Sequence, residues 1–280
     1  MLSYRHAFHA GNYADVLKHF IVCRILDYLT QKPGAIHYID THAGAGCYEL
    51  HRQTAQYLGE YKQGIGLLMN LDRKALPDSV VQYLQVVNQF NQSSVLKKYP
   101  GSPGFAATLL RPQDRLSFCE LQSAEFSFLL RQFSRHKNLR CYGEDGFAKA
   151  RALLPPKTES RALVLIDPSY EVKDDYKKVP ALVKELHRKF AVGIYAIWYP
   201  VVNQFASFMI RDLKKSGIKN IQRFEITRNA NTVASGMNTT GMIIINPPWK
   251  LKQEVDELFS VFAPLLGEHA QTLNEVLVEE

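Results

Sequence analysis

The 280-residue chain is predicted to form an α/β fold with a mostly parallel sheet and an inserted helical subdomain. Two observations lead to this prediction. Short, almost wholly apolar runs alternate with amphipathic helical patterns, as in a parallel sheet that is covered on both faces. A helical stretch rich in Gln, Asn and Tyr separates the first two apolar runs, which indicates that an insertion interrupts the sheet.

Composition limits the class of protein. Hydrophobic residues make up 46% of the chain and charged residues 22%, which is typical of a globular protein. The longest apolar stretch, residues 191–202, has 12 residues and contains a proline, whereas a membrane helix needs about 18 apolar residues. The first residues lack the apolar run of a secretory signal. The four cysteines form no Cys-x-x-Cys pair, so we expect neither disulfides nor a zinc site. We also expect the protein to be a cytoplasmic monomer that holds no metal.

Charge is distributed unevenly along the chain, although the net charge is only +7. Seven acids and no Lys or Arg follow Gln253, so residues 1–252 carry 34 basic side chains against 20 acidic ones. The basic residues concentrate in segments 131–161 and 209–228. A basic body with an acidic tail favours a polyanionic partner such as nucleic acid. The same residues also solvate ordinary helices, so charge alone does not decide between the two interpretations.

The first predicted elements are a helix from Asn12 to Leu29 and a strand from Ile36 to Asp40. Asn12 is a favourable N-cap, and Asp15, three residues later, completes a pattern that resembles a capping box. Apolar residues at helical spacing predict one buried face, and these are Leu17, Phe20, Ile21 and Ile25. The opposite face carries Lys18 and Arg24, with His19 near the boundary.

Residues 47–100 are predicted to form the helical subdomain, with helices near 55–71 and 78–91 and no strand. Residues 1–46 and 101–280 then make up one discontinuous domain. Helical patterns, such as those at 123–135 and 176–189, lie between most of its later strands. Those predicted strands are Leu116–Glu120, Leu139–Tyr142, Ala162–Asp167, Val192–Trp198, Ile221–Ile226 and Met242–Asn246.

Ligands of such sheets bind outside the carboxyl ends of the strands. The first strand leads into the turn 41–46, whose two glycines permit close approach to a nucleotide-type cofactor, although many ordinary turns also carry two glycines. Glu120 ends the second strand, where it could accept hydrogen bonds from both hydroxyls of a ribose or simply be a surface acid. Asp145 follows the third strand and could accept from an adenine amine beside Phe147.

The fourth strand runs into Asp167-Pro168-Ser169-Tyr170, an acid followed by a proline-bearing turn and an aromatic residue. In this order, the residues at the strand ends resemble those of S-adenosylmethionine-dependent methyltransferases that act on an exocyclic amine. Glu120 lies 80 residues after Asp40, where about 20 is usual. The inserted segment accounts for the excess.

Nearly the whole chain, including the insertion, resembles the RlmJ family of 23S ribosomal RNA adenine-N6 methyltransferases. The resemblance implies a Rossmann-like S-adenosylmethionine-dependent methyltransferase fold with an inserted helical subdomain, and methylation of N6 of an adenine in 23S ribosomal RNA. The segments that carry it are Met1–His6, Phe8–Asn12, Asp15–His19, Asp40–Gly46, Tyr99–Pro103, Ile194–Pro200 and Asn246–Lys250.

The resemblance also implies roles for single residues. Asp167 would be the catalytic acceptor, and Tyr4 and Lys18 would face the RNA, with His6 nearby. Tyr170 can stack on a base splayed out of its strand. The residues implied to contact S-adenosylmethionine are His19, His42, Ser102, Glu120, Asp145 and Gly146.

The chemistry of the reaction suits the turn at 167–170. The amine of adenine is a poor nucleophile, because its lone pair is delocalised into the ring. The Asp167 carboxylate and the Pro168 carbonyl, aimed at its hydrogens, would raise its electron density and stabilise the positive charge that develops on nitrogen. The family has Asp-Pro-Pro-Tyr here, so Ser169 removes one ring that stiffens the turn but leaves both acceptors.

A second run, 246–249, matches the amine-methyltransferase pattern more strictly, with two prolines and Trp249. We favour Asp167, because the second run follows the sixth strand after the insertion rather than the fourth strand. Asn246 is also neutral and could not accept a proton, and the family carries this run as a non-catalytic feature.

Other interpretations of the sequence stay open. His6, His9 and His19 could suggest a metal site, but no acid or cysteine completes a ligand set. The same chemistry could act on adenine in DNA, although no target-recognition domain is evident. A non-catalytic RNA-binding ribosome assembly factor on the same fold is a third possibility, which Ser169 alone encourages.

Overall fold

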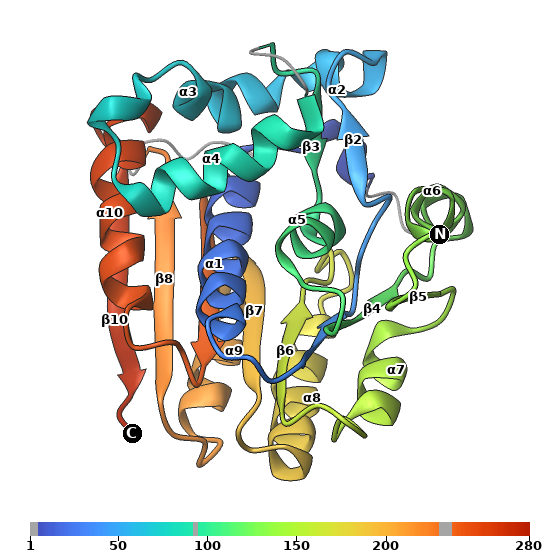
Figure 1. The fold of residues 1–280 in the computed structure, drawn as a ribbon. Helices are drawn as coiled ribbons and strands as arrows, with labels where there is room; N and C mark the ends of the chain where they lie inside the picture. Colours follow the sequence, from blue (N-terminus) through green and yellow to red (C-terminus); the bar gives the residue numbers. More distant parts are fainter. Residues whose placement is uncertain (1–4, 92–94, 230–236) are drawn as a thin grey trace.

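The apolar runs of the sequence become the strands of one large sheet. The protein is represented by a computed structural model that describes residues 5–91, 95–229 and 237–280. Within these residues the main sheet has eight strands in the order β10-β8-β9-β7-β6-β1-β4-β5 (Figure 1). The strands are β1 (Ile36–Asp40), β4 (Arg115–Cys119), β5 (Leu139–Tyr142), β6 (Arg161–Ile166), β7 (Ile194–Val201), β8 (Ile221–Thr227), β9 (Thr239–Ile245) and β10 (Gln271–Val278).

The strand order has a switch point at β1. The chain passes from β1 to β4 and β5 on one side, then returns to β6 and β7 on the other, and all neighbours among these strands are parallel. β9 lies antiparallel between β7 and β8, and β10 is antiparallel to β8. This topology confirms the predicted α/β, Rossmann-like fold class. It also directs attention to the carboxyl ends of β1 and β6.

Helices cover both faces of the sheet. One face is covered by α1, α5 and α10, and the other by α7, α8 and α9, while α6 packs against β5 at the edge (Figure 1). Their bounds are α1 (Tyr13–Thr30), α5 (Ser102–Leu109), α6 (Ser123–Phe133), α7 (Gly146–Leu153), α8 (Asp175–Lys189), α9 (Gln204–Lys214) and α10 (Leu251–Leu266), and a short 3₁₀ helix, η1, spans His6–Phe8.

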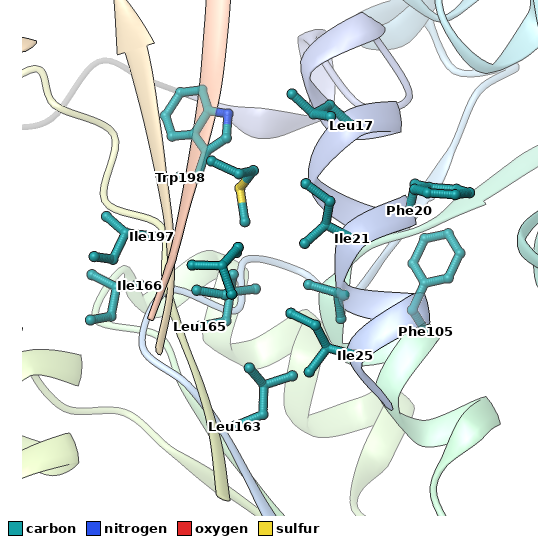
Figure 2. Packing of buried hydrophobic residues seen from close by; sticks show 14 of the residues in the cluster. Leu17, Phe20, Ile21, Ile25, Phe105, Leu163, Leu165, Ile166, Ile197 and Trp198 are labelled. Atoms are coloured by element: carbon teal, nitrogen blue, oxygen red, sulfur yellow. The ribbon is translucent and has the colours of Figure 1, made fainter. Parts of the chain in front are cut away.

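Helix α1 lies at the centre of the core. Figure 2 shows Leu17, Ile21 and Ile25 directed at the sheet, with Leu163 and Leu165 of β6 facing them. The predicted N-cap is confirmed, because the side chain of Asn12 accepts a hydrogen bond from the backbone N–H of Asp15 at 3.0 Å. The strand alternation that turns Leu163 and Leu165 toward α1 also decides which polar residues can reach this helix.

The polar face of α1 is buried, which amphipathicity alone did not predict. Every residue from Tyr13 to Leu26 is buried, including Lys18, His19 and Arg24. The reason is a further helical layer, since α4, α5 and α10 all contact α1. Arg24 meets this layer through an ion pair with Glu254 of α10, with 2.9 Å between Nη2 and Oε1. The polar side chains of α1 therefore become interior groups that need partners.

The insertion differs from its prediction in two ways. The single helix expected near 55–71 is wrong, because the chain turns at Gly59, with φ +62°, and at Gly64, where a Cβ would lie 2.1 Å from the Gly11 carbonyl oxygen. The expected absence of strands is also wrong, since β2 and β3 pair antiparallel. The elements are β2 (Cys47–Glu49), α2 (Gln53–Leu58), η2 (Glu60–Gln63), α3 (Ile65–Met69), η3 (Arg73–Ala75), α4 (Asp78–Asn91) and β3 (Lys98–Pro100).

The position of the insertion matters for the site. Figure 1 shows α2, α3 and α4 across the upper end of the molecule, and α4 contacts both α1 and α10. The pair β2–β3 connects the end of the β1 turn to the start of α5, through Cys47 opposite Pro100. The helical segment thus begins and ends beside the carboxyl edge of the sheet.

The run 246–249 lies at the edge of the sheet where the parallel strands begin, opposite the edge at which they end. β9 is antiparallel to β7, with Ile245 opposite Tyr195 near the start of that strand. Asn246 adopts a left-handed φ of 55°, and its side-chain amide donates to the carbonyls of Ala191 and Gly193 at 2.7 and 2.8 Å. In this structure the asparagine closes a turn at the end of the sheet far from Asp167.

We expect Asn246→Ala to lower the free energy of unfolding by about 2–3 kcal/mol, because it loses two hydrogen bonds and places alanine in the left-handed region. Chemical denaturation would measure this. Asn246→Gly loses the same bonds without the backbone strain, so it should cost less. Equal stability of Asn246→Ala and the wild type would contradict the capping role.

Candidate functional site

The candidate site lies where α1 begins over the carboxyl ends of β1 and β6. Leu165 of β6 faces α1 (Figure 2). Asp167 follows two residues later, just after the strand ends at Ile166, and alternation predicts that its side chain lies on the same face. Lys18, on the second turn of α1, reaches it there. The distance between Lys18 Nζ and Asp167 Oδ2 is 2.6 Å.

Lys18 joins two carboxylates. Its Nζ also lies 3.0 Å from Asp15 Oδ1 and over the Trp198 ring, 5.6 Å from the centroid. Asp15 accepts two further hydrogen bonds through Oδ2, from the Gly11 backbone N–H at 2.8 Å and from His6 Nε2 at 2.9 Å. These contacts tie the residues that precede α1 to the end of β6.

Burial and charge set the protonation of this cluster. Burial raises the pKa of Asp167 above its ordinary value, and Lys18 only partly offsets this effect. Burial also disfavours ionised Asp15, but the attraction of His6 and Lys18 outweighs it and holds the pKa of Asp15 well below its ordinary value. Asp15 therefore stays a carboxylate, while Asp167 is the more basic of the two acids.

A third carboxylate, Asp40, is fully buried at the end of β1. It accepts hydrogen bonds from the Tyr38 hydroxyl at 3.1 Å, from the His42 backbone N–H at 3.2 Å and from the Ser102 hydroxyl. Burial, with some repulsion from Asp167, raises the pKa of Asp40 to about 6 in spite of these bonds. Asp40 thus connects Ser102, the first residue of α5, to the β1 turn.

The turn after β1 is packed too tightly for larger residues. A Cβ on Gly44, which has φ +58°, would lie 2.2 Å from the Tyr48 hydroxyl. A Cβ on Gly146 would lie 1.9 Å from the Thr41 carbonyl oxygen, so the first turn of α7 touches backbone of the β1 turn. The Gly44 backbone N–H donates to Glu120 Oε2 at 2.9 Å. These contacts bring the ends of β1, β4 and β5 together.

The other predicted donor-binding residues of this region surround that turn. The His42 ring lies edge-on to Phe147 with centroids 5.2 Å apart, and burial lowers its pKa to about 4, so it is neutral near pH 7. Asp145 is exposed and caps α7, accepting from the Phe147 N–H at 2.8 Å. Glu120 is half-buried, which raises its pKa, and its Oε1 accepts from the Gln122 N–H at 2.7 Å.

His19 lies one turn beyond Asp15 on α1. Its Nδ1 is 2.8 Å from the Tyr99 hydroxyl, and its ring stacks on Phe105 with centroids 4.9 Å apart. Burial holds its pKa well below the ordinary value, so the ring is neutral. No described residue hydrogen-bonds its Nε2, which is therefore the nitrogen that can meet a ligand.

The residues expected to meet the RNA are placed differently from one another. Lys18 is buried rather than presented at the surface, and His6 joins it through Asp15. Tyr170 has a left-handed φ of 54°, donates its hydroxyl to the Trp198 carbonyl at 2.8 Å and is also buried. Tyr4 lies outside the described residues.

Sequence reasoning missed Asp15 and Trp198 as parts of this site. The spacing of three residues between Asp15 and Lys18 is the signal that could have shown their ion pair. Ala196 of β7 is paired with Leu165, so alternation along β7 puts Trp198 on the face of the sheet that meets α1 and could have placed its ring beside Lys18.

The arrangement fits a ligand that carries a nucleoside. Tight glycines let the backbone approach a ligand, and Glu120 and Asp145 stand at the ends of β4 and β5. A cavity of about 940 Å³ lies beside the turn, lined by Ala45 and Tyr48 among others, but none of the predicted donor-binding residues lines it. The predicted donor-binding residues lie instead at the strand ends, where polar side chains converge.

Two features are absent from residues 5–91, 95–229 and 237–280. No group of three or more His, Cys, Asp or Glu side chains is arranged to hold a metal ion. None of the helices there combines the length and apolar character that crossing a membrane requires.

The sequence of this chain is similar to those of known proteins. Residues 33–276 match the family described as "Ribosomal RNA large subunit methyltransferase D, RlmJ". The chain is 45% identical over 259 residues to "Ribosomal RNA large subunit methyltransferase J" of Escherichia coli, covering 92% of this chain and 91% of the relative. For the Haemophilus influenzae protein of the same description, the identity is 43% over 260 residues, or 92% of each chain.

A solved structure extends this similarity to three dimensions. It is a Legionella pneumophila protein that is 39% identical and superposes with a TM-score of 0.88, over 96% of this chain and 98% of that one. The fold described above is therefore shared with a relative over nearly its entire length.

The raised pKa of Asp40 has a consequence for stability. An acid whose folded pKa is about 6 binds more protons when folded than when unfolded, so its contribution is complete below about pH 4 and is lost as pH rises through 6. The wild type should therefore lose up to about 3 kcal/mol relative to Asp40→Asn between pH 4 and 7, since one pKa unit corresponds to about 1.4 kcal/mol. Denaturant unfolding of both proteins across this range measures the difference, and parallel curves would contradict it.

Proposed function

The chain belongs to the RlmJ family of large-subunit ribosomal RNA methyltransferases, and we propose that it transfers a methyl group from S-adenosylmethionine to N6 of an adenine in 23S ribosomal RNA. The observation that carries this proposal is the Asp167 carboxylate at the carboxyl end of β6. Lys18 occupies its Oδ2, whereas Oδ1 has no hydrogen-bond partner among the described residues. The side chain is 13% exposed, so an amine can reach it.

Asp167 acts on the target amine. S-adenosylmethionine supplies an electrophilic methyl group on its sulfonium. The free oxygen of Asp167 and the Pro168 carbonyl accept hydrogen bonds from the two hydrogens of the adenine amine, which raises electron density on N6 and stabilises the charge that develops there. When the N–CH₃ bond has formed, the carboxylate takes the proton that N6 loses.

Lys18 has a positioning role in this proposal rather than a contact with RNA at the surface. Its ion pair orients the Asp167 carboxylate and keeps it ionised in spite of burial. Burial in turn makes Asp167 more basic than an exposed carboxylate, which favours proton acceptance. Asp15 holds Lys18 from the other side.

The donor would lie across the ends of β1, β4 and β5. Glu120 would accept from the ribose hydroxyls and Asp145 from the adenine amine of the donor, while His42 and Gly146 close the space around them. His19, through its free Nε2, and Ser102, at the start of α5, would contact the donor from the opposite side.

The target adenine would enter between the residues that precede α1 and the turn 167–170. Tyr170 is the proposed stacking partner of the splayed-out base, because its hydroxyl is anchored to Trp198 and fixes the ring in the Asp167 turn. His6 and Tyr4 would contact the RNA from the N-terminal side.

We also propose that the protein acts in the cytoplasm as a monomer without a metal, and that residues 47–100 are its inserted subdomain. The four cysteines form no disulfide.

The direct test supplies the purified protein with labelled S-adenosylmethionine and, in separate reactions, with duplex DNA or with 23S ribosomal RNA from cells that lack the protein. Label in N6-methyladenosine of that RNA is the expected result, and mapping identifies the adenine. Label only in duplex DNA would replace RNA by DNA as the substrate. RNA binding without transfer would favour an assembly factor.

Removing the acceptor should separate chemistry from binding. We expect Asp167→Asn to lower the turnover rate by about 10²–10⁴-fold, the range typical of a lost general base, while affinity for the donor changes by less than about two-fold. Single-turnover assays and donor titration by calorimetry measure the two effects.

The control for that experiment is Asn246→Ala in the second proline-containing run. It should keep its turnover rate at temperatures where it is folded, since it lies at the far edge of the sheet. An Asp167→Asn protein as active as the wild type would overturn the assignment of the acceptor.

A further inference from the structure

A row of four aromatic rings leads from the Asp167 turn to the surface of α9. Tyr170 lies 4.5 Å from Tyr176 between ring centroids, Tyr176 stacks on Phe205 at 6.1 Å, and Phe205 lies 6.3 Å from Phe208. Burial decreases along the row. The two tyrosines are buried, Phe205 is half-buried and Phe208 is 40% exposed. The row therefore ends in a ring that is open to solvent.

Cations cover the outer rings. Lys173 Nζ lies over Phe205 at 5.6 Å from the centroid, and the guanidinium of Arg211 lies over Phe208 at 5.0 Å. Two exposed apolar side chains, Val172 and Val202, lie in the loops that follow β6 and β7. Aromatic rings combined with cations are the usual means of binding unpaired nucleotides, because every base has a π-face and every phosphate a negative charge.

The rest of α9 continues this surface with positive charge. Phe208 and Arg211 are three residues apart and share the solvent face of α9, and Lys215 is exposed at the C-cap of this helix. Lys214 and Lys219 are also exposed. Four of the six basic residues of segment 209–228, which the sequence singled out and the proposed site does not use, thus lie on α9 or just after it, next to the aromatic rings.

The position of α9 suits a strand that leaves the site. Ile166 of β6 is paired with Ile197 of β7, so β7 continues four residues beyond this level, to Val201. α9 therefore starts beyond the edge of the sheet at which Asp167 lies. It runs back along the face of the sheet that α8 also covers. A chain that passes Asp167 on this side meets the exposed valines, then Phe208, then the basic residues.

We propose that this α9 surface, made of Val172, Lys173, Val202, Phe205, Phe208 and Arg211, binds the ribosomal RNA strand next to the target adenine. A neighbouring base stacks on Phe208, and phosphates lie against Arg211 and Lys215. Residues 204–219 carry four basic side chains and one acid, Asp212, so their charge is complementary to RNA and favours this occupant over a protein. The inference rests on the proposed function and adds to it the path of the substrate.

The test compares two matched aromatic–cation pairs. The double variant Phe208→Ala/Arg211→Ala removes the pair on α9. The control, Trp249→Ala/Lys250→Ala, removes a similar pair at the opposite edge, where Trp249 is 74% exposed and Lys250 Nζ lies 5.0 Å from its centroid. Filter binding measures the dissociation constant of each protein for a 23S ribosomal RNA fragment that contains the methylated adenine.

The α9 variant should bind the fragment about ten-fold or more weakly, as expected for one lost stacking contact and one lost phosphate contact, and its affinity should depend less steeply on salt. The control should stay within about two-fold of the wild type, and both should bind the donor normally. Unchanged affinity of the α9 variant, or an equal loss in the control, would overturn the proposal. If the double variant is unstable, Arg211→Glu, at an exposed position, gives the same comparison.

This experiment separates the two proposals. A wild-type protein that binds the fragment but never methylates it ends the proposed function, while the affinity difference still decides the α9 surface. A protein that methylates the RNA and is unaffected by the α9 variant keeps its function and loses this surface. A variant that binds RNA normally but loses a protein partner would assign the surface to that protein instead, against our proposal.

Discussion

The site depends on one buried lysine. Lys18 lies in a layer between α1 and the sheet, where an unpaired ammonium would be strongly destabilising and the loss of one partner of a buried pair typically costs about 3–5 kcal/mol. Asp15 and Asp167 neutralise it from opposite sides. Because Asp15 also holds Gly11 and His6, the same pairing fixes the start of α1, the residues before it and the end of β6. The ion pairs that stabilise the fold therefore also set the geometry of the site.

The second constraint is close packing around the β1 turn. Gly146 lies against the Thr41 carbonyl and Gly44 against Tyr48, so neither position has room for a Cβ. Glu120 contributes by holding the Gly44 N–H, which leaves its carboxylate beside the turn. Residues from three strands thus converge although up to about a hundred positions separate them in sequence. A discontinuous set of this kind arises from sheet order, because parallel strands end at one edge.

Sequence patterns predicted the features that depend on neighbouring residues in the chain. They missed those that depend on how helices pack over one another. The long apolar strands and the acids at their ends were identified, since both follow from alternation and turn chemistry. The three-residue strands β2 and β3 are too short to show alternation, and β10 is a largely exposed edge strand without an apolar run. Burial of Lys18 and His19 follows from α4, α5 and α10, which no pattern within α1 could reveal.

The charges of the cluster explain why a paired carboxylate can still serve as the acceptor. Asp167 alone with Lys18 would form a neutral pair, which offers little attraction to a nitrogen that is becoming positive. Asp15, whose pKa is well below its ordinary value, supplies a second negative charge that offsets Lys18. The positive charge of Lys18 is therefore shared between two carboxylates, and the oxygen of the cluster that stays open is Asp167 Oδ1. An acceptor that is oriented in this way before substrate arrives costs no reorganisation during methyl transfer.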